Sequence, residues 1–587
     1  MKKLTLILAC IFASITAPAQ YGQRTYYFDT TTTETFNKGI ISTINMYNGL
    51  PVYAGTGTVN VYPANVTTHA RFVRAANNGT ILNNRRYNMY KNNTLVATRS
   101  NGIDDATNKF VMAGAVYGGT VAQIPGLSDV MIMKTTVNGV PTTPRHVDIG
   151  GGYDEALCVK NSTYNTQNFY TCGYSILQGV SRAFVMKHDA TGSVINWVKY
   201  FSIPCTAGQT NTRANYVIDD PATGNVCVVG TIDSSATGGC RQSFIMKMTR
   251  AGVFLWLHLY VYPNGTGIDF NSIKPTELAN EYIIAGTVGL PAPLNDRVLL
   301  FRVNTAGNVP NQVFANIMYT NGPTPNYPIQ KQKGLDATQR INGTAVTYFV
   351  CGETQYAFGT TDGIIFKTNG NGVPTAARLY GSTSNDRLNA IDQLNTSGAS
   401  GAGLASFGKS GYTGTAGTSA KDRSWLVKSY FNLVSGCNEI YDSTHSVAVT
   451  LSHTALQPTL LTAYIADTLS AQMVACKQSV LCWATTVAGG SNLRSASDES
   501  LIDLPGFNVY PNPLAVDEVT IELFSETSSV AMLNIIDATG RIVHESQVQL
   551  SEGSNRIKAD MSRNSKGWYV LQLVTNEGSY MSKLLKE

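Results

Sequence analysis

The chain has 587 residues, of which 43% are hydrophobic and only 14% are charged. This composition supplies ample material for buried cores and excludes a largely disordered polyelectrolyte. The formal net charge of +5 is too small for the basic footprint of a nucleic-acid-binding protein, so no nucleic-acid partner is predicted.

The N-terminus carries the pattern of a secretory signal peptide. Lys2 and Lys3 precede an apolar run that extends from Leu4 to Ala17. Ala17 and Ala19 place small residues at positions −3 and −1 of a cleavage site. Residues 1–19 are therefore predicted to be removed during export to the periplasm.

Two other membrane attachments were weighed. The run Ile7–Cys10 resembles a lipoprotein box, but cleavage there leaves only Leu4–Ala9 as a hydrophobic segment, which is short for a signal. No later run approaches the roughly 18 apolar residues that span a bilayer. The sequence therefore predicts an exported protein without a transmembrane segment.

Residues 20–440 contain an internal repeat, which decides the predicted fold. Each copy has an apolar run that ends in Gly, a loop, and a second apolar run that ends in Lys or Arg, usually with a Gly five residues later. Six intervals cover the 354 residues from Arg74 to Lys428, a mean period of 59. The chain thus has seven units, whose basic positions are Arg74, Lys134, Lys187, Lys247, Arg302, Lys367 and Lys428.

Each unit is predicted to supply four β-strands. In residues 184–197 two strands flank a tight turn at Gly192, where glycine accepts a positive φ without a steric penalty. Two earlier apolar runs complete the content of a propeller blade. The units resemble the bacterial β-propeller repeat of Bacteroidota surface proteins over roughly residues 40 to 440. The predicted fold is therefore all-β, with a seven-bladed β-propeller.

The ring of a propeller has to close, and the sequence offers two candidates for the last outer strand. One is Thr25–Phe28 near the N-terminus, and the other is the run Cys437–Ile440. Residues 441–483 hold two strand-like runs, Ser446–Leu451 and Leu460–Ile465. They are predicted to form an appended β segment whose fold the sequence does not specify.

The C-terminal part is predicted to be a separate small domain. Residues 484–504 are rich in Gly, Ser, Asp and Asn, which is typical of a linker. Residues 505–587 contain short β-rich runs separated by turn sequences such as Asp537–Gly540. This pattern predicts a β-sandwich.

Four spaced motifs in this domain, at Tyr510–Pro513, Asp537–Arg541, Gly567–Leu571 and Lys583–Lys586, resemble the C-terminal sorting domain of type IX secretion in Bacteroidota. The resemblance implies a translocon partner, and it implies a location outside the cell or on the outer cell surface. The motif residues include Tyr510, Pro511, Asn512, Pro513, Gly540, Gly567, Tyr569 and Lys583.

The sequence shows no catalytic or cofactor signature. The seven histidines lack metal-ligand spacing, and no Gly-x-Ser-x-Gly elbow occurs. Asp129, Asp296, Asp362 and Asp422 recur just before the third strand of a unit. Such aspartates ligate Ca²⁺ or cap turns, and turn capping is favoured. No catalytic residue, metal or cofactor is therefore predicted, and a non-enzymatic role is preferred.

Nine cysteines remain after the loss of Cys10, so at least one has no partner within the chain. Export makes disulfides possible, and Cys205 and Cys240 are the predicted pair. The alternative is two free thiols.

Loops of variable length on a regular scaffold favour a binding function. Tyr117, Tyr174, Tyr356 and Phe358 fall in such predicted loops, where their rings would stack on sugars. The leading hypothesis is a binding or adhesion module for a glycan or a protein. The alternatives are an extracellular polysaccharide hydrolase or lyase, and a surface spacer without a specific ligand.

Overall fold

The computed structural model describes residues 21–587 except for 28–31, 62–66, 92–93, 119–127, 143, 151, 178, 204–209, 222, 235–240, 292–294, 322–328, 357–358, 382–384, 395–402, 413–420, 436–438, 443, 459–464, 469, 476, 485–507, 513, 515–516, 526–528, 538–540, 552 and 576–577. The chain divides into two compact units, Met1–Arg494 and Ser495–Glu587. All regular elements in the described residues are β-strands, which confirms the all-β class.

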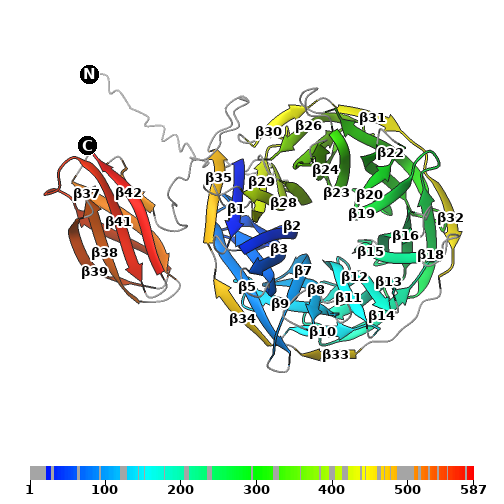
Figure 1. Ribbon diagram of the computed structural model, residues 1–587, viewed down its shortest axis with the longest axis horizontal. Helices are drawn as coiled ribbons and strands as arrows, with labels where there is room; N and C mark the ends of the chain where they lie inside the picture. The colour runs from blue at the N-terminus through cyan, green and yellow to red at the C-terminus, as the bar shows by residue number, and fades with distance from the viewer. Residues whose placement is uncertain are drawn as a thin grey trace, which may run out of the picture. The chain divides into compact units, whose positions relative to one another are not determined.

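The sheets of the first unit lie around a ring (Figure 1), and each is built from antiparallel meanders of four strands. The first three meanders are β2(Thr32–Tyr47), β3(Leu50–Val61), β4(Thr67–Ala75) and β5(Ile81–Lys91); β7(Thr98–Ala106), β8(Lys109–Tyr117), β9(Ser128–Thr136) and β10(Arg145–Asp148); and β11(Tyr153–Asn161), β12(Asn168–Leu177), β13(Val180–Asp189) and β14(Ile195–Phe201). The short β6(Thr94–Val96) pairs with β5.

The next three meanders repeat this order. They are β15(Thr210–Asp219), β16(Val226–Ser234), β17(Arg241–Met248) and β18(Phe254–Val261); β19(Gly267–Pro275), β20(Glu281–Gly289), β21(Asp296–Asn304) and β22(Asn311–Thr320); and β23(Ile329–Asn342), β24(Ala345–Tyr356), β25(Thr361–Thr368) and β26(Pro374–Tyr380).

The N-terminal strand closes the ring. The last stretch supplies three strands, β27(Arg387–Leu394), β28(Gly403–Tyr412) and β29(Lys421–Ser429), and β1(Tyr21–Tyr27) pairs with β29 as the fourth. The first of the two closure candidates therefore takes this place, although its Phe28 lies outside the described residues. Pairing the two ends of the ring covers an edge of β29 that would otherwise be open.

The residues expected to form an appended β segment do not build a sheet of their own. Their strands run around the outside of the ring (Figure 1) and add an outer antiparallel strand to meanders taken in reverse chain order, although none of the described strands pairs with the outer edge of β14. We call them the outer belt: β30(Glu439–Asp442) on β26, β31(Thr444–Ala448) on β22, β32(Ser452–Leu456) on β18, β33(Ile465–Thr468) on β10, β34(Ser470–Ala475) on β5 and β35(Lys477–Ala484) on β1. The belt protects outer sheet edges from pairing with other chains.

Glycine turns join the last two strands of the meanders, as predicted. Gly79, Gly139, Gly192, Gly252 and Gly372 all have φ between 69° and 78°. In the last repeat Leu433 takes φ 71°, a conformation that costs a residue with a side chain more than it costs glycine. The prediction of positive-φ glycines is confirmed at these five turns.

These turns also connect neighbouring meanders, because their carbonyl groups accept hydrogen bonds from the preceding outer strand. Tyr26 Oη donates to Gly79 O at 3.0 Å, and Tyr87 Oη donates to Gly139 O at 2.8 Å. Trp197 Nε1 donates to Arg250 O at 3.2 Å in the same way. The turn of each unit thus fixes its position against the unit before it.

Charged side chains from the first strands of the meanders meet at the centre of the ring. Asp336 of β23 is 1% exposed and binds two lysines, Lys38 of β2 at 3.4 Å and Lys274 of β19 at 3.2 Å. The Lys38 ammonium also lies 4.5 Å from the ring centroid of Tyr216 on β15. Burial opposes ionisation of Asp336, but Lys274 and Lys38 outweigh it and lower the pKa of this carboxyl below its usual value.

The second unit consists of two sheets. One contains β36(Asn508–Tyr510), β37(Glu518–Ser525) and β40(Gly553–Asp560); the other contains β39(Ile542–Leu550), β38(Ser529–Asp537), β41(Gly567–Thr575) and β42(Gly578–Lys586). They share one apolar core that includes Val519, Ile521, Leu533, Ile535, Leu571 and Leu573. This arrangement agrees with the β-rich runs predicted for residues 505–587.

We expect Asp336→Asn to lower the free energy of unfolding by about 3 to 5 kcal/mol at pH 7, because the buried Lys38 and the partly buried Lys274 lose their charged partner. The pKa of Asp336 is lowered in the folded state, so its contribution is present above the unfolded pKa of about 4 and fades as the pH falls. The difference between wild type and variant in urea unfolding should therefore shrink in acid.

Asp422→Asn is the control for this prediction. Asp422 pairs with Lys409 at 2.8 Å, and both side chains are partly exposed. Losing such a pair costs less than about 1 kcal/mol. Equal losses in the two variants would contradict a special role for the central charges.

Candidate functional site

The tyrosines expected in exposed loops lie in strands and are buried. Tyr117 ends β8, Tyr174 lies in β12 and Tyr356 ends β24, and their exposed fractions are 2%, 8% and 4%. The loop placement was therefore wrong. The physical reason for Tyr174 and Tyr356 is that each hydroxyl donates to a carboxylate, Glu155 or Asp362, at 2.8 Å. Phe358 lies outside the described residues.

The structure nevertheless brings Tyr117 and Tyr174 together around Glu155, with Tyr153 between them. The ring centroids of Tyr117 and Tyr153 are 5.9 Å apart, and Tyr153 stacks on Tyr174 at 5.9 Å. Tyr153 Oη and Tyr174 Oη each donate to Glu155 Oε2 at 2.8 Å. Because Tyr153 uses its proton there, Tyr117 Oη is the donor in the 3.2 Å contact between the two hydroxyls.

The other oxygen of Glu155 is also occupied. Asn101 Nδ2 donates to Oε1 at 2.7 Å, and Arg99 Nη1 lies 3.4 Å from the same atom. Arg213 places its guanidinium carbon 4.6 Å from the ring centroid of Tyr174, within cation–π distance. We call these residues the tyrosine–glutamate cluster: Arg99, Asn101, Tyr117, Tyr153, Glu155, Tyr174 and Arg213.

Electrostatics hold the cluster in one protonation state. Burial, followed by the charge of Glu155, raises the pKa of all three tyrosines far above the usual value of 10. Burial opposes the charge of Arg99, but Tyr117 and Glu155 raise the pKa of this guanidinium. The hydroxyls therefore remain donors and the arginine remains a cation at physiological pH.

The cluster reaches solvent through a few groups. Arg213 is exposed, Tyr153 is half-buried, and the Arg99 side chain is 35% exposed. These groups come from the beginnings of β11, β15 and β7, next to the ends of β8 and β12. The surface offers guanidinium donors beside an aromatic ring, which suits hydroxyl-rich or anionic ligands.

The sequence analysis found two members of the cluster and missed its centre. Glu155 and Tyr153 occur in an inner strand whose apolar pattern gave no sign of a buried carboxylate. Arg99 and Arg213 come from other meanders, and no local spacing connects them with Glu155. A tyrosine two residues before a glutamate on one strand is the only local signal, since such residues share a face.

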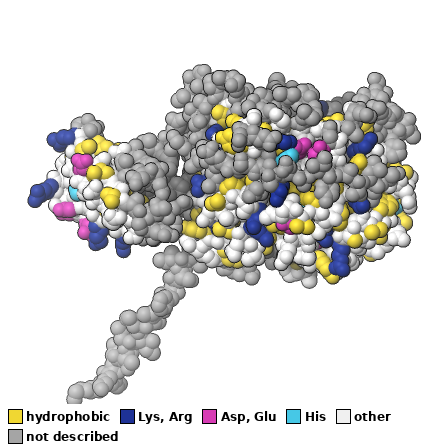
Figure 2. All heavy atoms as spheres, turned by 90° about the horizontal axis from the view of Figure 1, so that it is seen from below, with side chains coloured by type: hydrophobic (Ala, Val, Ile, Leu, Met, Phe, Trp, Pro, Cys, Tyr) yellow, Lys and Arg dark blue, Asp and Glu magenta, His cyan; other side chains and the backbone are white. Residues whose placement is uncertain are grey.

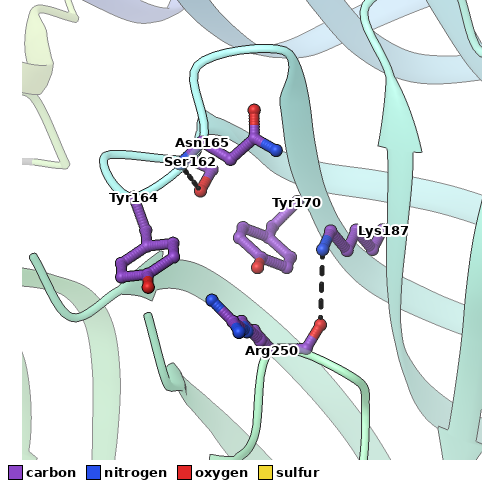
Figure 3. A pocket seen from close by; sticks show the side chains of 6 residues that line it. All are labelled: Ser162, Tyr164, Asn165, Tyr170, Lys187 and Arg250. Atoms are coloured by element: carbon purple, nitrogen blue, oxygen red, sulfur yellow. Dashed lines mark hydrogen bonds between the residues drawn. The ribbon is translucent and has the colours of Figure 1, made fainter. Parts of the chain in front are cut away.

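A small surface pocket lies at the other end of β11 (Figure 3). It has a volume of about 150 Å³ and is lined by Ser162, Tyr164, Asn165, Tyr170, Lys187 and Arg250. Ser162, Tyr164 and Asn165 come from the β11–β12 connection, and Arg250 lies in the turn after β17. The volume is below the roughly 300 to 1,000 Å³ of sites that enclose a whole small-molecule ligand.

The polar groups of this pocket mostly bind each other. Arg250 lies 4.8 Å from the ring centroid of Tyr164, and Lys187 Nζ donates to Arg250 O at 3.4 Å (Figure 3). Burial, followed by the charge of Arg250, lowers the pKa of Lys187. Two cations in so small a space suit a small anion or a connection between meanders, and the tyrosine–glutamate cluster is the stronger binding candidate.

Four of the remaining predicted site residues lie outside the part of the chain that the structure describes. Ala17 and Ala19, the predicted cleavage site, and Cys205 and Cys240, the predicted disulfide, lie outside the described residues. Those two hypotheses therefore stay predictions. Among the described cysteines, Cys158, Cys172, Cys227 and Cys351 are buried free thiols.

The tail motifs, distant in sequence, lie side by side in the second unit. Asn512 Oδ1 accepts a hydrogen bond from Leu585 N at 3.1 Å, and Leu514 N donates to Leu585 O at 2.7 Å. Tyr510 Oη binds the Glu522 carboxylate. The other motif positions are Gly567 and Tyr569 on β41, Lys583 on β42 and Pro511 after β36, while Pro513 and Gly540 lie outside the described residues.

Comparison with known families identifies the second unit. Residues 508–587 match the secretion system C-terminal sorting domain. This domain marks proteins exported by type IX secretion to the cell surface or outside the cell, so the predicted localisation is confirmed. In the described residues no helix is long and apolar enough to cross a membrane.

The first unit has no such match. No curated protein is similar to the chain. Among solved structures, a GH32 β-fructofuranosidase of Bombyx mori aligns over 73% of this chain and 86% of its own, with 10% identity and a TM-score of 0.23. A TM-score this low supports no inference about fold or activity.

Figure 2 shows one face of the molecule with its charged side chains. On the face drawn in Figure 2, lysine and arginine side chains are scattered over the described residues and form no continuous patch.

Proposed function

We propose that the first unit is a seven-bladed β-propeller that acts outside the cell as a binding module for a glycan or a protein. The tyrosine–glutamate cluster carries this proposal, because it presents guanidinium groups and an aromatic ring on a rigid frame. Glu155 accepts hydrogen bonds at both oxygens, which suits positioning of the tyrosines better than proton transfer. No specific observation favours the alternative of a polysaccharide hydrolase or lyase.

The blade count of the proposal rests on two independent patterns. The sequence repeats seven times between Arg74 and Lys428. The strands fall into as many groups of four when β1 is counted with β27, β28 and β29. A closed ring accounts for the hydrogen bonds between turns and the strands before them, including Tyr26 to Gly79 across the closure.

The blade count is tested by deleting residues 188–247, one complete unit. A closed propeller should lose cooperative thermal unfolding, because its ring needs a fixed number of blades. Removing residues 495–587 instead should leave the melting of the ring unchanged, since these residues form a separate compact unit. Near-parental melting of the first variant would favour an open solenoid, whose stability is roughly additive over its repeats.

The binding function is tested with a glycan array and candidate surface proteins, beside an activity screen on polysaccharides. Once a ligand is found, Arg213→Ala and Tyr153→Phe should weaken its affinity at least tenfold, because they remove an exposed donor and an ordering hydrogen bond. Arg250→Ala, at the other end of β11, is the matched control and should bind normally. Affinity insensitive to both cluster variants would contradict this site, and turnover abolished by Glu155→Gln would establish the hydrolase.

The sorting role is tested by deleting Gly567–Glu587, which removes β41 and β42 from their sheet and exposes the edge of β38. We expect the truncated protein to remain in the periplasm while the ring still folds. The measurement is cell fractionation, with Arg213→Ala as a variant that should be exported normally. Truncated protein at the parental level on the surface or in the medium would rule out a sorting role for this domain.

A further inference from the structure

Three aspartates converge at the junction between the β7–β10 and β11–β14 meanders. Asp129 lies in β9, Asp148 ends β10 and Asp154 lies in β11. One carboxylate oxygen from each lies within 4.8 Å of the others. These two meanders are also joined by a parallel bridge between Ser128 and Tyr153, so the three acids sit at a seam of the ring.

Asp154 has a structural partner at one oxygen and no hydrogen-bond partner at the other. Its side chain is completely buried, and Oδ2 accepts a hydrogen bond from Ile149 N at 2.7 Å. The second oxygen, Oδ1, is buried without a hydrogen-bond partner. A buried carboxylate oxygen of this kind is costly unless another group compensates its charge.

At other junctions between meanders, an uncharged side chain accepts the equivalent hydrogen bond from the backbone of the preceding meander. Thr212 Oγ1 accepts a hydrogen bond from Ile203 N at 3.1 Å, and Gln332 Oε1 accepts one from Thr320 N at 3.0 Å. Each of these residues lies near the start of an inner strand and binds the backbone at or just after the end of the preceding outer strand, as Asp154 does. A neutral acceptor is sufficient for this connection, so the carboxylate at position 154 requires a different explanation.

Basic and polar groups face the three acids from several elements. Lys91 Nζ lies 2.9 Å from Asp129 Oδ2, and His146 Nδ1 lies 2.6 Å from the same oxygen. His146 is 7% exposed and pairs with Asp129 through this contact. The Ser175 hydroxyl approaches Asp154 and Gly150 N donates to Asp148 Oδ1 at 3.0 Å, but neither carries a charge. Lys91 and His146 both pair with Asp129, whereas the buried Oδ1 of Asp154 accepts no hydrogen bond and is available to a divalent cation.

We propose that Asp129, Asp148 and Asp154 bind a calcium ion at this junction. Carboxylate oxygens are the ligands that Ca²⁺ prefers, and water completes its usual six to eight ligands. Bound there, the ion joins the third and fourth strands of one meander to the first strand of the next. It also fixes the beginning of β11, where Tyr153 enters the tyrosine–glutamate cluster. The proposal is independent of any ligand at that cluster.

Calorimetric titration of the EDTA-treated exported protein with CaCl₂ tests this site. We expect one Ca²⁺ per chain with a Kd of about 0.1 to 1 mM, the range of extracellular calcium modules, and a melting temperature that rises with CaCl₂. Asp148→Asn should weaken binding at least tenfold while the protein still folds without calcium. Asp154→Asn should do the same, since an asparagine oxygen can keep the bond from Ile149 N.

Asp422→Asn is the matched control. Asp422 lies near the start of β29 and pairs with a lysine, as Asp129 does in β9, but among the described residues it belongs to no group of three acids. This variant should bind calcium like the wild type. The proposal is overturned if the wild type binds no calcium, if Asp148→Asn binds it equally well, or if Zn²⁺ binds at these residues and Ca²⁺ does not.

Discussion

The sheets of the first unit have two apolar faces, and this single property governs the rest of the structure. In β8 and β20 every residue after the first is buried, so both faces of the strand are covered. A single sheet of this kind cannot be stable in water, because each face has to be buried against another element. Arranging the sheets around a ring satisfies all faces at once, as the contact between Phe72 of β4 and Phe110 of β8, with centroids 5.2 Å apart, illustrates.

Closing the ring places charged side chains and backbone polar groups where they need partners within the protein. The first strands converge at the centre, where Asp336 pairs with both Lys38 and Lys274 in a region with little solvent. At the periphery, outer strands would leave backbone groups unpaired, and the belt β30–β35 pairs with most of them. Between neighbours, turn carbonyls accept hydrogen bonds from Tyr26, Tyr87 and Trp197. These ion pairs and hydrogen bonds therefore stabilise the arrangement of sheets that burial of the apolar faces favours.

The candidate binding site follows from the same geometry. The beginnings of inner strands and the ends of second strands from three neighbouring meanders meet at the tyrosine–glutamate cluster. Arg99, Glu155 and Arg213 come from β7, β11 and β15, which are distant along the chain and adjacent in the ring. The sorting domain, in contrast, comprises residues 508–587. Export and the proposed binding therefore belong to different parts of the chain.

Local patterns were sufficient to predict the all-β class, the repeated strand units, the positive-φ glycines and the C-terminal sorting domain, because each depends on residues that are neighbours along the chain. The strand runs around Val519, Ala531 and Tyr569 are examples. The outer belt was not predictable, since pairing of β31 with β22 depends on where an already closed ring presents an edge. The exposure of Tyr174 was misjudged for the same reason: its hydroxyl binds Glu155 across a strand pair, and that partner buries the ring. Burial, ion pairing and the meeting of Asp129, Asp148 and Asp154 depend on contacts between elements, which only the tertiary structure decides.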